Sequence, residues 1–169
     1  MYTLSQTSLD KLKGVHPNLV NFMTELIKIS PWNFKITAGV RTAEEQNRLY
    51  QKGRTVPGAK VTNVDGYKLK SNHQVKFNGL GYATDIGVLV KEKVKVSVVE
   101  NGKKVEKVIE KDIYKGTWKD FHYYQDIYDT AKKAGLLEKY GIEWGGNCWK
   151  TFKDAPHWQI KGADRVPYK

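Results

Sequence analysis

The sequence predicts an α+β fold, in which helices pack on a small, largely antiparallel sheet. Apolar residues recur at helical spacing in the first 30 residues and again near residues 118–134. Extended patterns gather between residues 80 and 110 and near the end of the chain. This distribution disfavours regular βαβ winding and favours helices on one antiparallel sheet. The length of 169 residues fits one domain, 1–169, that folds without disulfides.

Two helices are expected within residues 5–29. Ser5 or Thr7 can cap a short first helix that ends at Gly14, and Pro17 suits the first turn of the second helix. Pro31 ends the second helix, and residues 34–37 alternate as in a short strand. The residues of the second helix that we expect to face the core are Leu19, Phe22, Met23, Leu26 and Ile27.

A third helix is expected to begin at Thr42. This residue and Glu45 have the spacing of a capping box, and the helix should run to Gly53. Residues 53–72 are rich in Gly, Lys and Asn, which is typical of a surface loop. Residues 80–90 are apolar enough for a central strand.

The second half of the chain begins with a hairpin pattern at residues 93–110. Asn101-Gly102 is a favoured two-residue turn, and the many Lys and Glu residues indicate a peripheral, solvated insertion. Thr117 can cap a helix that runs from Trp118 to about residue 134 and is closed by Gly135. Short extended segments are expected at residues 142–144 and 157–160.

The composition indicates a polyanionic partner and leaves its kind open. The net charge is +11, from 29 Lys and Arg against 18 Asp and Glu. An anionic envelope polymer fits better than nucleic acid, because the basic residues are scattered and form no arginine-rich stripe. The lone Cys148 excludes an internal disulfide and a thiolate metal cluster, and we interpret it as an inert, partly buried thiol.

The N-terminus lacks the pattern of a signal peptide, and no stretch has the length of a membrane span. We therefore expect a soluble, monomeric protein made in the cytoplasm.

The four histidines divide into two groups. His16 precedes a proline at a helix entry and His122 lies within an aromatic helical segment, so we interpret both as structural. His73 and His157 lie beside acidic residues at the junctions of loops and strands. Asp85 interrupts an otherwise apolar strand, where a carboxylate is costly unless it is paired with a cation. It could bind a zinc ion, or it could pair with a lysine or cap a turn.

A second acidic segment, Asp154-Ala155-Pro156-His157, offers another histidine. Pro156 disfavours a helix, so Asp154 should lie on a turn and His157 should open a strand. One side chain could then bind a metal ion while the other accepts a proton from water. The alternative is an ordinary aspartate turn followed by a buried histidine.

Taken together, these segments resemble a family of zinc peptidases. Ser71-Asn72-His73, Gly81-Tyr82-Ala83-Thr84-Asp85 and the segment that ends at His157 match the motif Ser-x-His-x-x-Gly-x-Ala-x-Asp with a distant Asp-x-x-His. The family includes L-alanyl-D-glutamate endopeptidases of phage lysins, D-alanyl-D-alanine carboxypeptidases and vancomycin-resistance D,D-dipeptidases. Shorter pieces that look like the endopeptidase branch are Val15-His16-Pro17, Gly39-Val40-Arg41-Thr42, Gly53-Arg54-Thr55, and Trp144-Gly145-Gly146 before Phe152.

The resemblance implies the hedgehog and D,D-peptidase type of fold and one Zn²⁺ per chain, held by His73, Asp85 and His157. It implies that Asp154 is the general base and that Arg41 stabilises the oxyanion; the alternative for Arg41 is a surface ion pair. Ser71 and Gln46 are expected to contact substrate, with local backbone capping as their alternative.

The implied activity is hydrolysis of amide bonds in peptidoglycan stem peptides, most specifically by an L-alanyl-D-glutamate endopeptidase that acts as an endolysin. The alternatives are a D-alanyl-D-alanine carboxypeptidase and a non-catalytic, basic cell-wall-binding module. Such an enzyme acts in the periplasm or outside the cell, so another factor would have to release it.

The chain departs from the family motif in one respect that bears on the metal site. His73 and Asp85 are further apart here than in the motif. We interpret the surplus as a loop insertion within residues 75–79, which leaves the segment from Gly81 to Asp85 in register.

Overall fold

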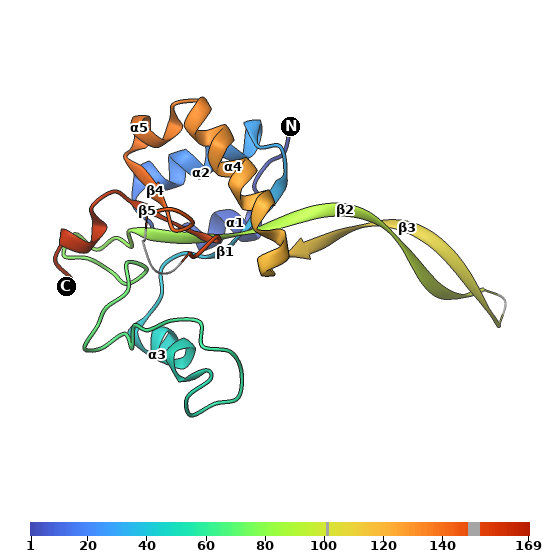
Figure 1. The fold of residues 1–169 in the computed structure, drawn as a ribbon, viewed down its shortest axis with the longest axis horizontal. Coiled ribbons are helices and arrows are strands. Elements are labelled where there is room, and N and C mark those ends of the chain that lie inside the picture. Colours follow the sequence, from blue (N-terminus) through green and yellow to red (C-terminus); the bar gives the residue numbers. More distant parts are fainter. Residues whose placement is uncertain (101, 149–152) are drawn as a thin grey trace.

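An antiparallel sheet with the strand order β1-β2-β5-β4 forms the centre of the structure, and β3 pairs with the outer part of β2 (Figure 1). The structure is a computed structural model that describes residues 1–100, 102–148 and 153–169. The strands are β1 (Asn33–Ala38), β2 (Ala83–Glu100), β3 (Lys103–Lys115), β4 (Ile142–Trp144) and β5 (His157–Ile160).

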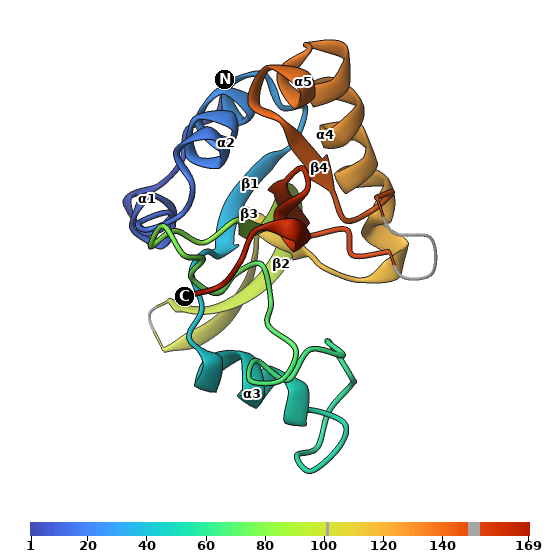
Figure 2. The ribbon, with the colours of Figure 1, turned by 90° about the vertical axis from the view of Figure 1, so that its left-hand side faces the viewer.

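The helices lie on both sides of this sheet. Helices α2, α4 and α5 cover one side, whereas α3 and the long loop after it lie on the other side (Figures 1 and 2). Helix α1 lies against β1, where the Ser8 hydroxyl accepts a hydrogen bond from the Ile36 N–H at 3.1 Å. No helix in the described part of the chain is long and apolar enough to cross a membrane. The helices are α1 (Gln6–Lys11), α2 (Pro17–Ile29), α3 (Ala43–Gln51), α4 (Phe121–Lys133) and α5 (Leu136–Tyr140), with 3₁₀ turns at Trp118–Asp120 and Ala163–Arg165.

The hydrophobic core includes the apolar faces of α2 and α4 and the side of the sheet that these helices cover. Helix α2 begins with Pro17 in its first turn, and its buried side chains recur at the predicted helical spacing. All five predicted core residues of α2 are buried. Buried side chains in the same cluster from other elements include Ile36, Ile86, Val88, Tyr124, Ile127, Trp144 and Trp158.

Strand alternation directs polar side chains to the opposite face of the sheet. Successive side chains of a strand point to opposite faces, so the buried Ile86 and Trp158 place their neighbours Asp85 and His157 away from the core. Gln159 shares the face of His157, because it lies two residues further along β5. The face of the sheet toward α3 therefore carries a carboxylate, an imidazole and an amide.

The hairpin differs from its predicted form in one respect. The sequence suggested a central strand at residues 80–90 and a separate hairpin arm after it, but β2 is one continuous strand across both segments. β2 pairs with β1 only as far as Leu89, and beyond that point β3 is its partner. After Val90 the sequence of β2 changes from a continuous apolar run to alternating apolar and polar residues. This change marks the point where the rest of the protein no longer covers the strand, although the strand itself continues.

The remaining features of the hairpin agree with the prediction. Most of its residues beyond Val90 are solvent-exposed, and Gly102 has a φ of +76°, a value that favours glycine. Asn101, the other predicted turn residue, lies outside the described residues. The hairpin projects from the side of the molecule (Figure 1).

Helix ends were predicted less well than helix positions. Ser5 caps α1, which ends at Lys11, before the predicted end at Gly14. The predicted helix from Trp118 to about residue 134 is divided into a 3₁₀ turn and α4, and α5, which was not predicted, follows it. Gly135 follows the end of α4 as expected. With a φ of +71°, it is also the N-cap residue of α5. The capping box of Thr42 and Glu45 is confirmed.

We predict that Tyr124→Phe destabilises the fold by about 1–3 kcal/mol, because it leaves polar backbone groups at the base of the hairpin without a partner. The Tyr124 hydroxyl lies 2.6 Å from the carbonyl oxygen of Lys115 and accepts from the Val88 N–H at 3.4 Å. Urea denaturation measures the change. Tyr128→Phe, one turn further along α4, is the matched control, and an equal loss in both variants would contradict the explanation.

Candidate metal centre

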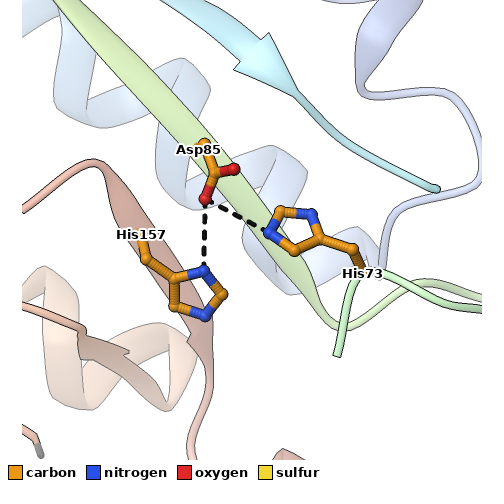
Figure 3. Close-up of side chains that lie close together, drawn as sticks. All are labelled: His73, Asp85 and His157. Carbon is orange, nitrogen blue, oxygen red and sulfur yellow. Dashed lines mark hydrogen bonds and ion pairs between the residues drawn. The ribbon is translucent and has the colours of Figure 1, made fainter. Parts of the chain in front are cut away.

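Three side chains from separate elements meet on the face of the sheet opposite the core (Figure 3). His73 lies in the loop before β2, Asp85 lies within β2, and His157 begins β5. The Asp85 Oδ1 atom lies 3.2 Å from His73 Nε2 and 3.2 Å from His157 Nδ1. One ligand atom from each residue lies within 4.8 Å of the other two, which is close enough for all three to bind one metal ion.

The pairing of β2 with β5 positions two of these residues. Asp85 is the direct cross-strand partner of His157 in the antiparallel register, so their side chains project from the same face. On its other side, Asp85 pairs with Ala38, where a register shift interrupts the pairing of β1 with β2. The shift lies beside the loop that carries Gly39 and Arg41.

A backbone carbonyl group orients His73. Its Nδ1 atom lies 2.7 Å from the carbonyl oxygen of Gly39, and the ring is 2% exposed. A carbonyl oxygen only accepts, so Nδ1 carries the proton and, in the neutral ring, Nε2 presents its lone pair to Asp85. The backbone N–H of Arg41 donates to the carbonyl oxygen of His73 at 3.0 Å. This second bond also joins His73 to the loop that carries Gly39 and Arg41.

An amide side chain orients His157 in the same way. Gln159 Nε2 donates to the Glu143 carboxylate at 2.7 Å, so Gln159 directs Oε1 toward His157 Nε2 at 2.9 Å. His157 Nε2 therefore carries a proton, and the lone pair of the neutral ring lies on Nδ1, which faces Asp85. In both histidines, the nitrogen far from Asp85 is engaged and the near nitrogen is available as a ligand.

This arrangement has the chemistry of a cation site. Two neutral imidazole lone pairs that face one carboxylate oxygen repel each other unless a proton or a cation lies among them. Burial lowers the pKa of His73 despite the charge of Asp85. Burial also acts to lower the pKa of His157, but the hydrogen bond and charge of Asp85 outweigh it and raise that pKa. The donor set, two imidazole nitrogens and one carboxylate, fits zinc.

The Asp85 carboxylate remains charged within this cluster. Burial by itself raises the pKa of Asp85, but the charges and hydrogen bonds of His73 and His157 lower it well below its usual range. Its second oxygen, Oδ2, lies 3.2 Å from a terminal nitrogen of Arg41. Asp85 is therefore paired with two histidines and an arginine, and the alternative of a lysine pair is wrong.

Arg41 is held from two sides. Its other terminal nitrogen donates to Gln46 Oε1 at 2.8 Å, and Gln46 Nε2 donates to Thr62 and to the carbonyl oxygen of Val64. Gln46 is 1% exposed, and its side-chain amide is engaged within the protein by these three partners. The predicted contact of Gln46 with substrate stays a prediction. Ser71 is half-buried and accepts from the His73 N–H at 3.4 Å, a local contact of the kind that its alternative describes.

Asp154 lies on the turn before β5, as predicted. Its N–H donates to the carbonyl oxygen of Gly145 at 2.9 Å, and its carbonyl oxygen accepts from the His157 N–H at 3.2 Å. The carboxyl group is half-buried. Burial and then the negative charge of Asp85 raise its pKa to about 6, against the opposing charges of His157 and Arg41.

Cys148 lies outside the cluster. Burial raises the pKa of the half-buried Cys148 to about 12, which keeps it as a thiol. The group of metal-binding side chains found among the described residues does not include it. A hollow of about 300 Å³ is lined in part by Lys70, Lys169 and Arg41, and Arg41 connects it to the cluster through its contact with Asp85. Phe152, which is part of the resemblance to the endopeptidase branch, lies outside the described residues.

The sequence profile of the phage L-alanyl-D-glutamate peptidase family matches residues 1–115. The chain belongs to this family. The match includes His73 and Asp85 and ends before Asp154 and His157, and in the tertiary structure His157 joins the first two in one cluster. The resemblance stated from the motifs is thereby confirmed at the level of the family.

Two relatives of this peptidase-family chain are informative. It is 30% identical over 125 residues to the peptidoglycan L-alanyl-D-glutamate endopeptidase CwlK of Bacillus subtilis strain 168, an alignment that covers 74% of this chain and 59% of CwlK. The chain thus aligns with less than two thirds of that relative. The crystal structure of the Serratia marcescens L-Ala D-Glu endopeptidase ChiX superposes with a TM-score of 0.60 at 23% identity, over 97% of this chain and 94% of ChiX. This likeness confirms the predicted fold.

Sequence reasoning did not find the residues that orient the two histidines. Gly39 acts through its carbonyl oxygen, which no side-chain pattern reveals. Gln159 could have been found, because it lies two residues after His157 in an expected strand and therefore shares its face.

We predict that Gln46→Leu destabilises the fold by about 1–3 kcal/mol, since it leaves Arg41 and the carbonyl oxygen of Val64 without their buried partner. The free energy of unfolding from urea titration is the measurement. Gln51→Leu on the same helix removes a half-buried amide that contacts Asn47, and a smaller loss is expected there. Equal losses would argue against a special role for Gln46.

Proposed function

We propose that this chain is a zinc-dependent L-alanyl-D-glutamate endopeptidase that cleaves peptidoglycan stem peptides. The observation that carries the proposal is the convergence of His73, Asp85 and His157, whose possible ligand atoms all lie within 4.8 Å of one another. Membership of the phage L-alanyl-D-glutamate peptidase family supports the substrate. CwlK and ChiX are both named as endopeptidases for the same bond.

The ligand set favours zinc as the resident ion. Two imidazoles and one carboxylate are a typical three-ligand set of catalytic zinc sites, which keep a fourth position for water or substrate. Zinc bound here would act as a Lewis acid and lower the pKa of water from about 15.7 to about 7. Gly39 and Gln159, which hold the far nitrogens of the two rings, would keep both rings in the orientation that binds the ion.

Asp154 is the proposed general base. It would accept a proton from the attacking water and deliver that proton to the leaving amine as the amide bond breaks. The turn that carries it leads directly into His157, and its pKa of about 6, raised by burial and by the charge of Asp85, suits both transfers near neutral pH. Arg41 would stabilise the negative charge that develops on the scissile carbonyl oxygen. Its contacts with Asp85 and Gln46 hold the guanidinium group at the edge of the cluster.

The basic surface fits an anionic cell-wall substrate. The net charge of +11 would raise the local concentration of the chain at such a surface, although it does not select a bond. Specificity for the L-alanyl-D-glutamate bond rests on the family and on the relatives. The site chemistry by itself would serve a D-alanyl-D-alanine carboxypeptidase equally well.

We predict that digestion of purified peptidoglycan releases stem peptides with a new N-terminal D-glutamate, identified by mass spectrometry. Asp154→Asn should keep its zinc and lose about 100-fold to 10,000-fold in rate, since it cannot accept the proton. Release of free D-alanine instead would establish the carboxypeptidase. Intact peptidoglycan together with tight wall binding would establish the non-catalytic module, and near-normal cleavage by Asp154→Asn would refute its role as base.

We predict that the chain binds one zinc ion and that His157→Ala loses most of it, because two ligands remain. Elemental analysis after dialysis against metal-free buffer measures the stoichiometry. The control is His122→Ala, which removes a solvent-exposed imidazole outside the cluster and should leave the zinc content unchanged. Zinc retained at one per chain in His157→Ala would exclude this ligand set.

A further inference from the structure

A fully buried lysine lies behind the metal centre, in the segment that lengthens the chain between His73 and Asp85. Lys76 is 0% exposed, and its ammonium group donates to Asn72 Oδ1 at 2.8 Å. The same group lies 3.4 Å from the centroid of the Tyr168 ring, in a cation–π contact. Burial of an ammonium group costs free energy unless such partners compensate it, so the contacts of Lys76 with Asn72 and Tyr168 are needed to keep it in this position.

The C-terminal segment encloses Lys76. Lys76 and Tyr168 form an antiparallel bridge, and the Phe77 N–H donates to the carbonyl oxygen of Pro167 at 3.0 Å. The Tyr168 hydroxyl lies 3.1 Å from Asn72 Oδ1. Burial lowers the pKa of Lys76 to about 8, against the opposing charge of Asp164, so the ammonium form prevails at neutral pH.

The ammonium group determines the orientation of the Asn72 amide. An ammonium group only donates, so it requires the oxygen of this amide and directs Nδ2 to the other side. There Nδ2 donates to Gln159 Oε1 at 3.0 Å and to the Asp164 carboxylate at 2.7 Å. Because a carboxylate only accepts, Asp164 supports the same orientation.

The orientation of Asn72 is passed to the metal ligand through Gln159. Gln159 Oε1 accepts from Asn72, while Gln159 Nε2 donates to the Glu143 carboxylate at 2.7 Å. With its nitrogen directed to Glu143, Gln159 presents only its oxygen to His157 Nε2 at 2.9 Å. The oxygen and nitrogen of each amide could in principle exchange places. The Lys76 ammonium group and the carboxylates of Asp164 and Glu143 together fix one orientation for both amides.

We propose that Lys76 is a positioning residue that acts through Asn72 and Gln159 to hold the proton of His157 on Nε2, leaving Nδ1 to bind the metal ion. The inference rests on the metal centre of the proposed function. It gives the loop insertion at residues 75–79 a task in assembling that centre. Zinc ligands depend on such outer partners, whose loss typically weakens metal affinity about 10-fold to 100-fold.

The test compares zinc affinity between Lys76→Met and the unchanged chain, by competition with a chelator of known affinity. Methionine keeps most of the volume and removes the ammonium group, and we expect about 10-fold weaker binding. The matched control is Lys70→Met, which removes an exposed ammonium group 5.5 Å from the same Tyr168 ring and should bind zinc as the unchanged chain does. An affinity of folded Lys76→Met within twofold of the unchanged chain would overturn the proposal.

A double variant tests whether Lys76 acts through Asn72. Asn72→Ala should weaken zinc binding by itself, and Lys76→Met added to it should cause no further loss. Losses that multiply would show that Lys76 acts independently, which contradicts the proposal.

A measurement on the unchanged chain covers the case in which Lys76→Met does not fold. In the zinc-loaded protein, ¹⁵N chemical shifts of His157 should show a proton on Nε2 and the metal ion on Nδ1; the reverse assignment overturns the proposal. If the unchanged chain binds no zinc, the metal centre itself has failed, and this outcome is distinct from zinc binding that Lys76→Met leaves intact.

Discussion

The antiparallel register of β2 and β5 is the constraint on which the site depends. It places Asp85 directly opposite His157 on the face that points away from the core, while Ile86 and Trp158 are buried in the core on the other face. A slip of one residue would reverse both faces of a strand, placing a charge in the core and Trp158 in the site. The core therefore enforces the register, and the register brings together two of the three proposed ligands.

The pKa values of Asp85 and Asp154 are shifted in opposite directions by their surroundings. Asp85 receives both imidazoles on one oxygen and Arg41 on the other, and its pKa is held well below the usual range. Burial and the charge of Asp85 raise the pKa of Asp154 to about 6. Pairs of acids whose environments separate their pKa values commonly perform different tasks, which fits the proposed roles of Asp85 as a ligand and Asp154 as the general base.

Backbone hydrogen bonds close the loop between His73 and Asp85. The Lys76 N–H donates to the carbonyl oxygen of Leu80 at 2.9 Å, and the Tyr82 N–H donates to that of Asn72 at 2.8 Å. These bonds return the chain to β2 in the register that Asp85 needs. The hairpin of β2 and β3 differs, because it extends a strand outward and leaves the pairing of Asp85 unchanged.

The sequence by itself located most helices and strands and the side chains that we propose as ligands. Periodicity located α2, the capping box located α3, and an aspartate inside an apolar strand marked Asp85, because such signals lie within a few neighbouring residues. The tertiary structure decided what depends on distant segments: the continuity of β2, the hold of Gln46 on Arg41, and the path from Lys76 to His157. The hydrogen bonds of those contacts join residues far apart in the chain, and their geometry exists only after the sheet register has formed.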